Sequence, residues 1–326
     1  MSKPLLEVRD LTISIGSTAA KIDIVDGVSF SVQPNEPFGI VGESGSGKSM
    51  IALAIMGLLP KALKITSGTI LFDGKEIQSL SQRDMQRLRG KELAMVFQEP
   101  STALNPVFTT GAQLVEVLRR HEGLSPKAAR ARVIELFGQV GIPSPADRFD
   151  DYPHQMSGGM RQRVMIAMAL CCNPRLIIAD EPTTALDATI QLQIMRLLAR
   201  LQKETGVAVM FISHDLALVS NFVRRVQVMY AGRLAECGTA EAVFSTPAHP
   251  YTEGLMRCAY GLEDRMERLP TIEGQVPTPN RFPKGCRFST RCAHVQEVCR
   301  HVPPPRYALA AGHESACYRH IDFKTE

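Results

Sequence analysis

The sequence predicts an α/β fold with a parallel sheet, followed by a small C-terminal unit. Four short apolar runs have the length of buried strands, and segments with helical spacing of apolar residues separate them. The runs are residues 38–42, 93–98, 176–180 and 207–212. Strands that alternate with helices form a parallel sheet covered on both faces. Near residue 258 the alternation stops, so we expect one domain over 1–258 and another over 259–326.

The first apolar run, FGIVG, leads into a glycine-rich loop and then into KSMIALAIMGLL, which predicts a helix up to Pro60. The loop fits the pattern G-x-x-x-x-G-K-[ST], in which backbone N–H groups converge on phosphates, the lysine reaches the terminal phosphates and the hydroxyl ligates magnesium. The predicted phosphate site consists of Gly42, Glu43, Ser44, Gly45, Ser46, Gly47, Lys48 and Ser49. Taken alone, this loop fits a kinase, a GTPase or a transport ATPase.

A helical region follows the second strand, LAMVFQ. Ser125 and Pro126 indicate a helix start, and Gly141 can end that helix. We therefore expect a helical subdomain over about residues 100–158. A later helix, between the third and fourth strands, is expected to stop at Gly206. Its apolar side is formed by Ile190, Ile194, Leu197 and Leu201.

Polar residues with catalytic chemistry stand at the ends of the other strands. LIIAD ends in Asp180, which suits a magnesium shell, and Glu181 follows it, placed to polarise an attacking water. His214 follows the strand VAVMFI, and Gln98 ends LAMVFQ. Because the carboxyl ends of parallel strands share one edge of a sheet, we expect His214 to contact the γ-phosphate and Gln98 to lie nearby. The alternative interpretation is that Asp180 and Glu181 form only a solvated strand end and a helix cap.

A second anion site is predicted at Ser157, Gly158 and Gly159, in HQMSGGMRQR. The segment after it, VMIAMALCC, continues as a helix until Asn173 and Pro174. A helix N-terminus presents free backbone N–H groups and a partial positive charge to an anion.

Composition and charge exclude several classes of protein. Apolar residues make up 44% of the chain, enough for a full core, and 37 Lys and Arg against 33 Asp and Glu is too small an excess for a nucleic-acid binder. Charges at Glu7, Arg9 and Asp10 argue against an apolar signal region. The longest apolar run, residues 50–60, is about half of the ~20 residues that a membrane-spanning helix needs. We expect a cytoplasmic chain.

In their order along the chain, these motifs resemble those of the ATP-binding subunits of ABC transporters. They are the phosphate loop, Gln98, the signature MSGGM, LIIADEP, TALD at residues 184–187, and His214. The resemblance implies a P-loop NTPase (RecA-like) core with a helical ABC subdomain, and an ATPase in which Ser49, Gln98 and Asp180 hold Mg²⁺. It also implies that two nucleotide domains pair head to tail, so that Ser157, Gly158 and Gly159 close on the partner's ATP.

Two positions depart from the family pattern. Met160 stands where the signature usually has glutamine. No aromatic residue precedes Phe30, although the family usually stacks one on adenine, so an apolar contact such as Ile15 is the expected substitute.

The C-terminal segment holds four of the eight cysteines: Cys286, Cys292, Cys299 and Cys317. Their spacing differs from the short knuckles of structural zinc sites. Three interpretations of these cysteines stay open: ligands of an iron–sulfur cluster, ligands of a zinc ion together with histidines, or thiols without a ligand. The candidate histidines are His294, His301 and His313. HPYTEGLM (249–256) and PKGCRFSTRC resemble the C-terminal extension of peptide permease ATPases, and this resemblance favours a 4Fe-4S cluster.

The resemblance implies the ATP-hydrolysing subunit of an ABC importer that energises uptake of dipeptides or oligopeptides, bound to the cytoplasmic face of the inner membrane. The implied partners are a second ABC ATPase, two transmembrane permease subunits and, indirectly, a periplasmic peptide-binding protein. In the family, the second ATPase tends to be a related chain and not a second copy. No nucleic acid is expected as a partner. The alternative is a soluble ABC ATPase of DNA maintenance or translation. We also expect the four cysteines to staple the tail, and their loss to leave ATP binding largely intact.

Overall fold

The computed structural model describes the chain except for residues 1–2, 17–20, 185, 262–270, 311 and 323–326. The described chain divides into two compact units. Unit 1 comprises residues 1–32, 37–78 and 212–326, and unit 2 comprises 33–36 and 79–211. Residue 258, where we expect a domain boundary, lies within helix α11 (Pro250–Gly261).

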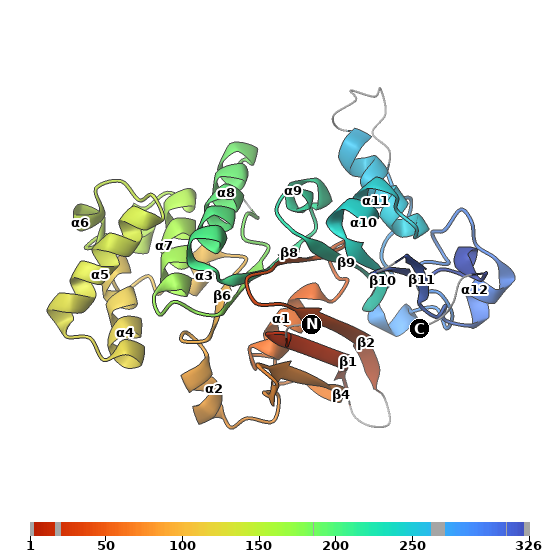
Figure 1. Cartoon of the computed structure of the whole chain (residues 1–326), viewed down its shortest axis with the longest axis horizontal. Coiled ribbons are helices and arrows are strands. Elements are labelled where there is room, and N and C mark those ends of the chain that lie inside the picture. Colours follow the sequence, from red (N-terminus) through yellow and green to blue (C-terminus); the bar gives the residue numbers. More distant parts are fainter. Residues whose placement is uncertain (1–2, 17–20, 185, 262–270, 311, 323–326) are drawn as a thin grey trace. The chain divides into compact units, whose positions relative to one another are not determined.

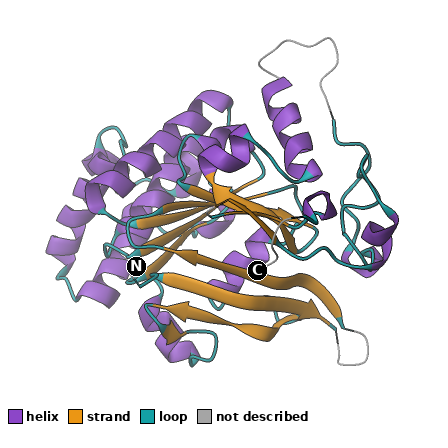
Figure 2. Ribbon diagram, turned by 45° about the vertical axis from the view of Figure 1, so that its right-hand side comes forward, coloured by secondary structure: helices purple, strands orange, loops and turns teal. Residues whose placement is uncertain are grey.

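Unit 1 begins with an antiparallel sheet that the sequence reasoning missed. Its strand order is β2-β1-β4-β5, which Figures 1 and 2 show as one layer. The bounds are β1 (Leu6–Ile15), β2 (Ile22–Val32), β4 (Leu63–Phe72) and β5 (Lys75–Glu76). Leu6 and Val8 alternate with exposed or half-buried residues and are buried against the core, as a strand with one covered face requires. This alternation is the signal that was available in the sequence.

The second sheet of unit 1 carries the phosphate loop. Its strands lie in the order β11-β12-β10-β9-β3. The bounds are β3 (Pro37–Val41), β9 (Arg225–Tyr230), β10 (Arg233–Thr239), β11 (Tyr307–Ala310) and β12 (His313–Ser315). β3 pairs in parallel with β9, a strand that was not predicted, whereas β10, β12 and β11 continue the sheet in antiparallel fashion. This continuation joins the C-terminal segment to the sheet through backbone hydrogen bonds.

The helices of unit 1 are short. Their bounds are α1 (Lys48–Ile55), α9 (Leu216–Ser220), α10 (Ala240–Ser245), α11 and α12 (Glu297–His301), with 3₁₀ turns at Pro279–Arg281 and Tyr318–His320. The predicted helix up to Pro60 is wrong at its end, because α1 stops at Ile55. Gly57, with φ +62°, takes the left-handed position, and the Leu58 amide donates to the Leu53 carbonyl over 2.8 Å. This is a Schellman ending.

Unit 2 contains the predicted helical region, which Figure 1 shows as a cluster of helices. Strands β6 (Leu93–Val96) and β7 (Leu176–Asp180) pair in parallel, and β8 (Ala208–Ser213) crosses the boundary between the units along the chain. The helices are α2 (Gln82–Leu88), α3 (Pro100–Ala103), α4 (Thr110–Glu122), α5 (Pro126–Gln139), α6 (Pro145–Arg148), α7 (Gly158–Leu170) and α8 (Ala188–Thr205), with a 3₁₀ turn at Pro153–Gln155.

The predicted ends of α5 and α8 in unit 2 are confirmed, whereas the predicted continuation of α7 to Asn173 is wrong, because α7 ends at Leu170. The Ser125 side chain caps α5 by accepting the Ala128 amide over 3.3 Å, and Gly141 follows its end with φ +78°. Gly206 ends α8 with φ +70°. Within the described residues, no helix is both long and apolar enough to cross a membrane.

Candidate functional site

The predicted phosphate loop lies between β3 and α1, and its glycines are required by its backbone. Gly45 and Gly47 have φ values of +80° and +96°, which side chains disfavour. Gly42 has φ +149°, and a Cβ there would collide with the Met229 carbonyl on β9. The loop therefore keeps a backbone path that other residues would disturb.

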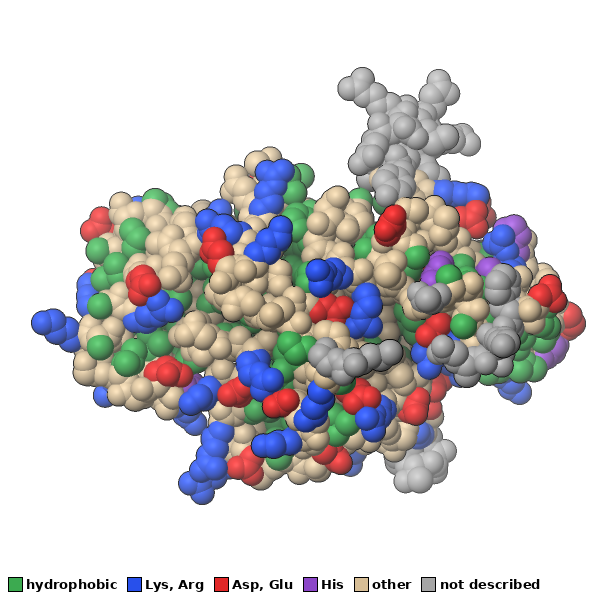
Figure 3. All heavy atoms as spheres, in the orientation of Figure 1, with side chains coloured by type: hydrophobic (Ala, Val, Ile, Leu, Met, Phe, Trp, Pro, Cys, Tyr) green, Lys and Arg blue, Asp and Glu red, His purple; other side chains and the backbone are tan. Residues whose placement is uncertain are grey.

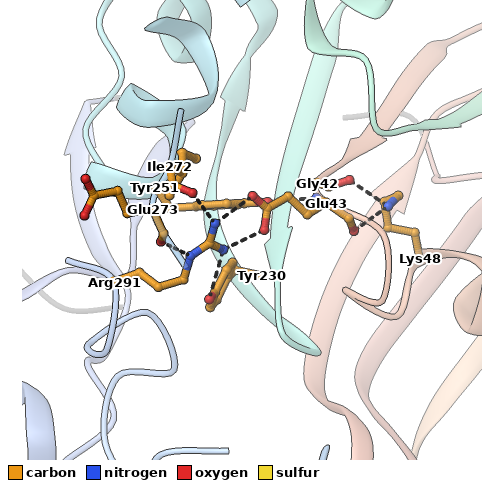
Figure 4. Close-up of polar contacts among 8 residues, drawn as sticks. All are labelled: Gly42, Glu43, Lys48, Tyr230, Tyr251, Ile272, Glu273 and Arg291. Atoms are coloured by element: carbon orange, nitrogen blue, oxygen red, sulfur yellow. Dashed lines mark hydrogen bonds and ion pairs between the residues drawn. The ribbon is translucent and has the colours of Figure 1, made fainter. Parts of the chain in front are cut away.

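Lys48 belongs to the loop by contact as well as by sequence. Its side chain is buried, and Nζ donates to the carbonyl oxygens of Gly42 (2.7 Å) and Glu43 (3.0 Å) and to the Ser46 hydroxyl (3.3 Å). Figure 4 shows the two carbonyl contacts. The cation is thus held within the curve of the loop, where a terminal phosphate can take over its donors.

Unit 2 brings together Gln98 and Glu181, as expected for residues at the ends of neighbouring parallel strands. Gln98 Nε2 donates to Glu181 Oε2 over 3.1 Å, and the Thr184 hydroxyl donates to the same oxygen over 3.0 Å. Glu181 has φ +43°, a left-handed conformation that non-glycine residues take at a cost, often at functional sites. Asp180, one residue earlier, is buried at the end of β7.

The signature segment forms the start of α7. Ser157 is its N-cap, and its hydroxyl accepts the Met160 amide over 3.3 Å. A Cβ on Gly159 would lie 3.2 Å from Ile190 Cγ2 of α8, and one on Gly158 would lie 3.4 Å from Leu186. Small residues therefore let the helix end lie close to the TALD segment, of which residue 185 is outside the described residues.

His214 directly follows β8 and is exposed. It belongs to unit 1 with residues 42–49, whereas Gln98, Ser157, Gly158, Gly159, Asp180 and Glu181 belong to unit 2. The loop residues contact one another within unit 1, and Gln98 and Glu181 contact each other within unit 2. Joint action of the two sets on one nucleotide stays a prediction.

Two residues of the C-terminal half contact the phosphate loop, and the sequence reasoning missed both. The Glu43 amide donates to the Tyr251 hydroxyl over 2.8 Å, and the Glu43 carboxylate binds the Arg291 guanidinium at 2.7 and 3.1 Å (Figure 4). Tyr251 lies in the HPYTEGLM stretch, and Arg291 precedes Cys292. The tail therefore contacts the loop directly. These contacts argue against the expectation that loss of the cysteines leaves ATP binding intact, which stays a prediction.

A further arginine joins the tail to the strands around the loop. Arg287 donates to the Asp26 carboxylate over 2.7 Å and to the Ala231 carbonyl. Next to Ala231, the Gly232 amide donates to the Ser46 carbonyl over 3.0 Å. Burial, with nearby Arg233, lowers the pKa of Arg287 to about 10. Arg287 and Arg291 each stand beside a cysteine of the C-terminal set.

The HPYTEGLM stretch also holds the backbone of Tyr251 in place. Burial lowers the pKa of His249 to about 4, so its ring is neutral, and Nδ1 accepts the Tyr251 amide over 3.0 Å. The His249 amide in turn donates to the buried Glu236 carboxylate over 2.8 Å. Tyr251 itself is fully buried and packs against Tyr230 with ring centroids 4.6 Å apart.

All four C-terminal cysteines are free thiols that line one small cavity of about 20 Å³. Burial raises the pKa of Cys286 to about 11, and the neighbouring cysteines add to the shift. In the part of the chain that the structure describes, no three His, Cys, Asp or Glu side chains could hold one metal ion. The iron–sulfur assignment therefore stays a prediction.

The histidines considered for zinc do not gather. His294 lines the cysteine cavity, whereas His301 and His313 hydrogen-bond to Glu297 and Glu236, each over 2.8 Å. Figure 3 shows histidine side chains on the surface of the C-terminal region.

Comparison with known proteins identifies the class. Residues 25–184 match the model of the ABC transporter family, and residues 235–299 match that of the oligopeptide/dipeptide transporter C-terminal region. A solved ATP-binding cassette, in a dimeric structure bound to ADP and phosphate, covers 72% of this chain and 98% of its own at 28% identity and a TM-score of 0.64. The chain belongs to the ABC transporter family, and the fold predicted from its motifs is confirmed.

Similar proteins indicate a narrower group within the ABC transporter family. A putative peptide import ATP-binding protein of Brucella melitensis is 48% identical over 96% of this chain and 94% of its own length. The dipeptide transport ATP-binding protein DppD of Escherichia coli is 46% identical over 98% and 97%, and DppD of Bacillus subtilis is 46% identical over 96% and 94%. The resemblance to peptide permease ATPases is confirmed.

Proposed function

We propose that the chain is the ATP-hydrolysing subunit of an importer that drives uptake of dipeptides or oligopeptides across the inner membrane. The observation that carries the proposal is the pairing of two features in one chain. The cassette has the motifs of an ABC ATPase, and its C-terminal region matches that of peptide transporters over residues 235–299. Relatives named for peptide import cover nearly the whole chain, which favours this function over DNA maintenance or translation.

The roles of the site residues follow from their chemistry. The amides of residues 42–49 and the Lys48 ammonium bind the phosphates, while Ser49, Gln98 and Asp180 hold Mg²⁺. Glu181 polarises the attacking water, and its contact with Gln98 fixes the direction of its carboxylate. His214 supports the γ-phosphate. None of these groups forms a covalent intermediate, so catalysis depends on positioning and electrostatics.

The signature segment acts on a second nucleotide domain. Ser157 is exposed at a helix N-terminus, a position suited to an anion that arrives from outside the chain. We infer that Ser157, Gly158 and Gly159 close on ATP held by a partner ATPase, and that the dimer couples this closure to two transmembrane permease subunits. A periplasmic peptide-binding protein delivers the substrate. The chain itself then lies on the cytoplasmic face of the inner membrane.

We propose that Cys286, Cys292, Cys299 and Cys317 hold a 4Fe-4S cluster that stabilises the C-terminal region. Four free thiols around one cavity are the usual ligand set of such a cluster. A single zinc ion would draw its four sulfurs to roughly 3.8 Å from one another, given Zn–S bonds of about 2.3 Å in a tetrahedron. Zinc stays the alternative occupant of the same four thiols, and the metal content of the purified chain distinguishes the two.

The test is ATP hydrolysis by the chain assembled with its permease subunits in lipid vesicles. Adding binding protein loaded with a dipeptide or oligopeptide is expected to raise the hydrolysis rate, whereas binding protein without peptide is the control. A rate that responds to DNA or ribosomes and not to loaded binding protein would support the alternative function.

A further inference from the structure

We propose that Arg291, in the C-terminal region, is a positioning residue for the phosphate loop, and that it acts by holding and neutralising Glu43. The inference rests on the proposed role of residues 42–49 in binding ATP. It assigns to the peptide-transporter C-terminal region a direct effect on nucleotide affinity.

The first support is the completeness of the Arg291 contacts. Nη1 and Nη2 bind the two carboxylate oxygens of Glu43, and Nη1 also donates to the Tyr230 hydroxyl over 3.3 Å. Nη2 donates to the Ile272 carbonyl over 3.0 Å and Nε to the Glu273 carbonyl over 2.9 Å. All five N–H donors of the guanidinium therefore have an acceptor. The side chain is 5% exposed, so this pair differs from a surface ion pair, which contributes little.

The second support is the place of Glu43 in the loop. Its amide donates to Tyr251, while its carbonyl accepts both Lys48 Nζ (3.0 Å) and the Ser46 amide (3.2 Å). Figure 4 shows the chain of contacts from Arg291 through Glu43 to Lys48. Fixing Glu43 at its side chain and its amide therefore fixes the carbonyl that orients the phosphate-binding lysine.

The third support is electrostatic. A carboxylate at the second position of a loop that receives a polyphosphate repels the ligand, most strongly where the surroundings exclude water. A bidentate guanidinium cancels that charge and keeps its geometry. Burial is the largest single influence on the pKa of Arg291 and acts to lower it, but the hydrogen bonds to Glu43 and Tyr230 and the charges of these two groups together outweigh burial. The net shift of the pKa is upward, so the cation persists at any working pH.

The experiment measures ATP affinity of the full chain by titration calorimetry with Mg-ATP. Arg291→Ala is expected to weaken binding on the order of 10-fold, the effect of losing a charge-assisted contact. Adding Glu43→Gln to this variant is expected to recover most of the loss, because a neutral amide no longer repels phosphate. Arg291→Lys keeps the charge but loses the bidentate geometry of the guanidinium, so its ATP affinity should lie between those of wild type and Arg291→Ala.

Two controls separate positioning from general damage. Arg306→Ala removes another C-terminal arginine, which pairs with Glu314 at 3.4 Å, and is expected to bind ATP as wild type does. Raising the salt concentration should narrow the gap between Arg291→Ala and wild type, since salt screens the exposed carboxylate. A loss due only to altered packing would respond neither to salt nor to Glu43→Gln, and that result would overturn the proposal.

Lys48→Ala distinguishes failure of the proposal from failure of the site assignment. Loss of binding in Lys48→Ala with wild-type affinity in Arg291→Ala would overturn the positioning role alone. Wild-type affinity in Lys48→Ala would show that residues 42–49 are not the ATP site, and both inferences would fall together.

Discussion

Glu181→Gln is the most informative change in the hydrolysis site, because it removes a charge and little else. The Glu181 Oε2 atom accepts from Gln98 at 3.1 Å and from Thr184 at 3.0 Å. A glutamine keeps a carbonyl oxygen that can accept the same two donors, so the side chain is expected to stay in place. What disappears is the negative charge that draws a proton from the attacking water.

The expected loss of hydrolysis rate is on the order of 10²- to 10⁴-fold, the usual contribution of general-base assistance. This corresponds to about 3 to 5 kcal/mol in the activation free energy. ATP binding should change little, since Glu181 is not among the residues that carry the phosphate contacts.

The assay is a single-turnover measurement of ATP hydrolysis, with affinity measured in parallel by titration calorimetry. Glu181→Asp is the matched variant, because it keeps the charge but shortens the reach. A Glu181→Gln protein that hydrolyses ATP at the wild-type rate would refute the assignment. An equal loss of binding and hydrolysis would mean that the change disturbed the loop after β7 and not the chemistry alone.

Two further predictions concern the signature segment and the cysteines. Ser157→Arg should leave ATP binding to the isolated chain intact yet prevent ATP-dependent dimerisation, which size-exclusion chromatography measures; loss of ATP binding as well would point to misfolding of α7. Anaerobically purified chain should be brown, with iron and acid-labile sulfide each near four per chain. Cys292→Ser should bleach the protein and expose the tail to protease, and it should also weaken ATP binding because Arg291 is the preceding residue. Colourless protein with stoichiometric zinc would contradict the cluster. Unchanged ATP affinity in Cys292→Ser would contradict the connection between the cysteines and the phosphate loop.

The parts of the fold that local sequence determines were predictable. A strand, a glycine loop and a helix in series identify the phosphate site, and Ser125, Gly141 and Gly206 mark helix ends because capping depends on neighbouring residues only. Parallel strand ends also explain why Gln98 and Glu181 meet.

The contacts made by the C-terminal region could not be predicted in the same way. Glu43 and Arg291 stand 248 positions apart, and no local pattern connects a carboxylate in a phosphate loop with an arginine beside a cysteine. The antiparallel strands β1, β2 and β4 had a signal in their alternation, but the pairing between distant strands depends on the whole core. Sequence distance is therefore a poor guide to which parts of the tail contact the phosphate loop.

The central claim is that ATP hydrolysis by this chain drives peptide import. Its most direct test uses vesicles that contain the permease subunits, with the chain and ATP inside and binding protein loaded with a labelled dipeptide or oligopeptide outside. The measurement is the accumulation of labelled peptide inside the vesicles. We predict ATP-dependent accumulation with the wild-type chain and none with Glu181→Gln. Accumulation that persists with Glu181→Gln, or its absence with wild-type chain that hydrolyses ATP in the same vesicles, would contradict the claim.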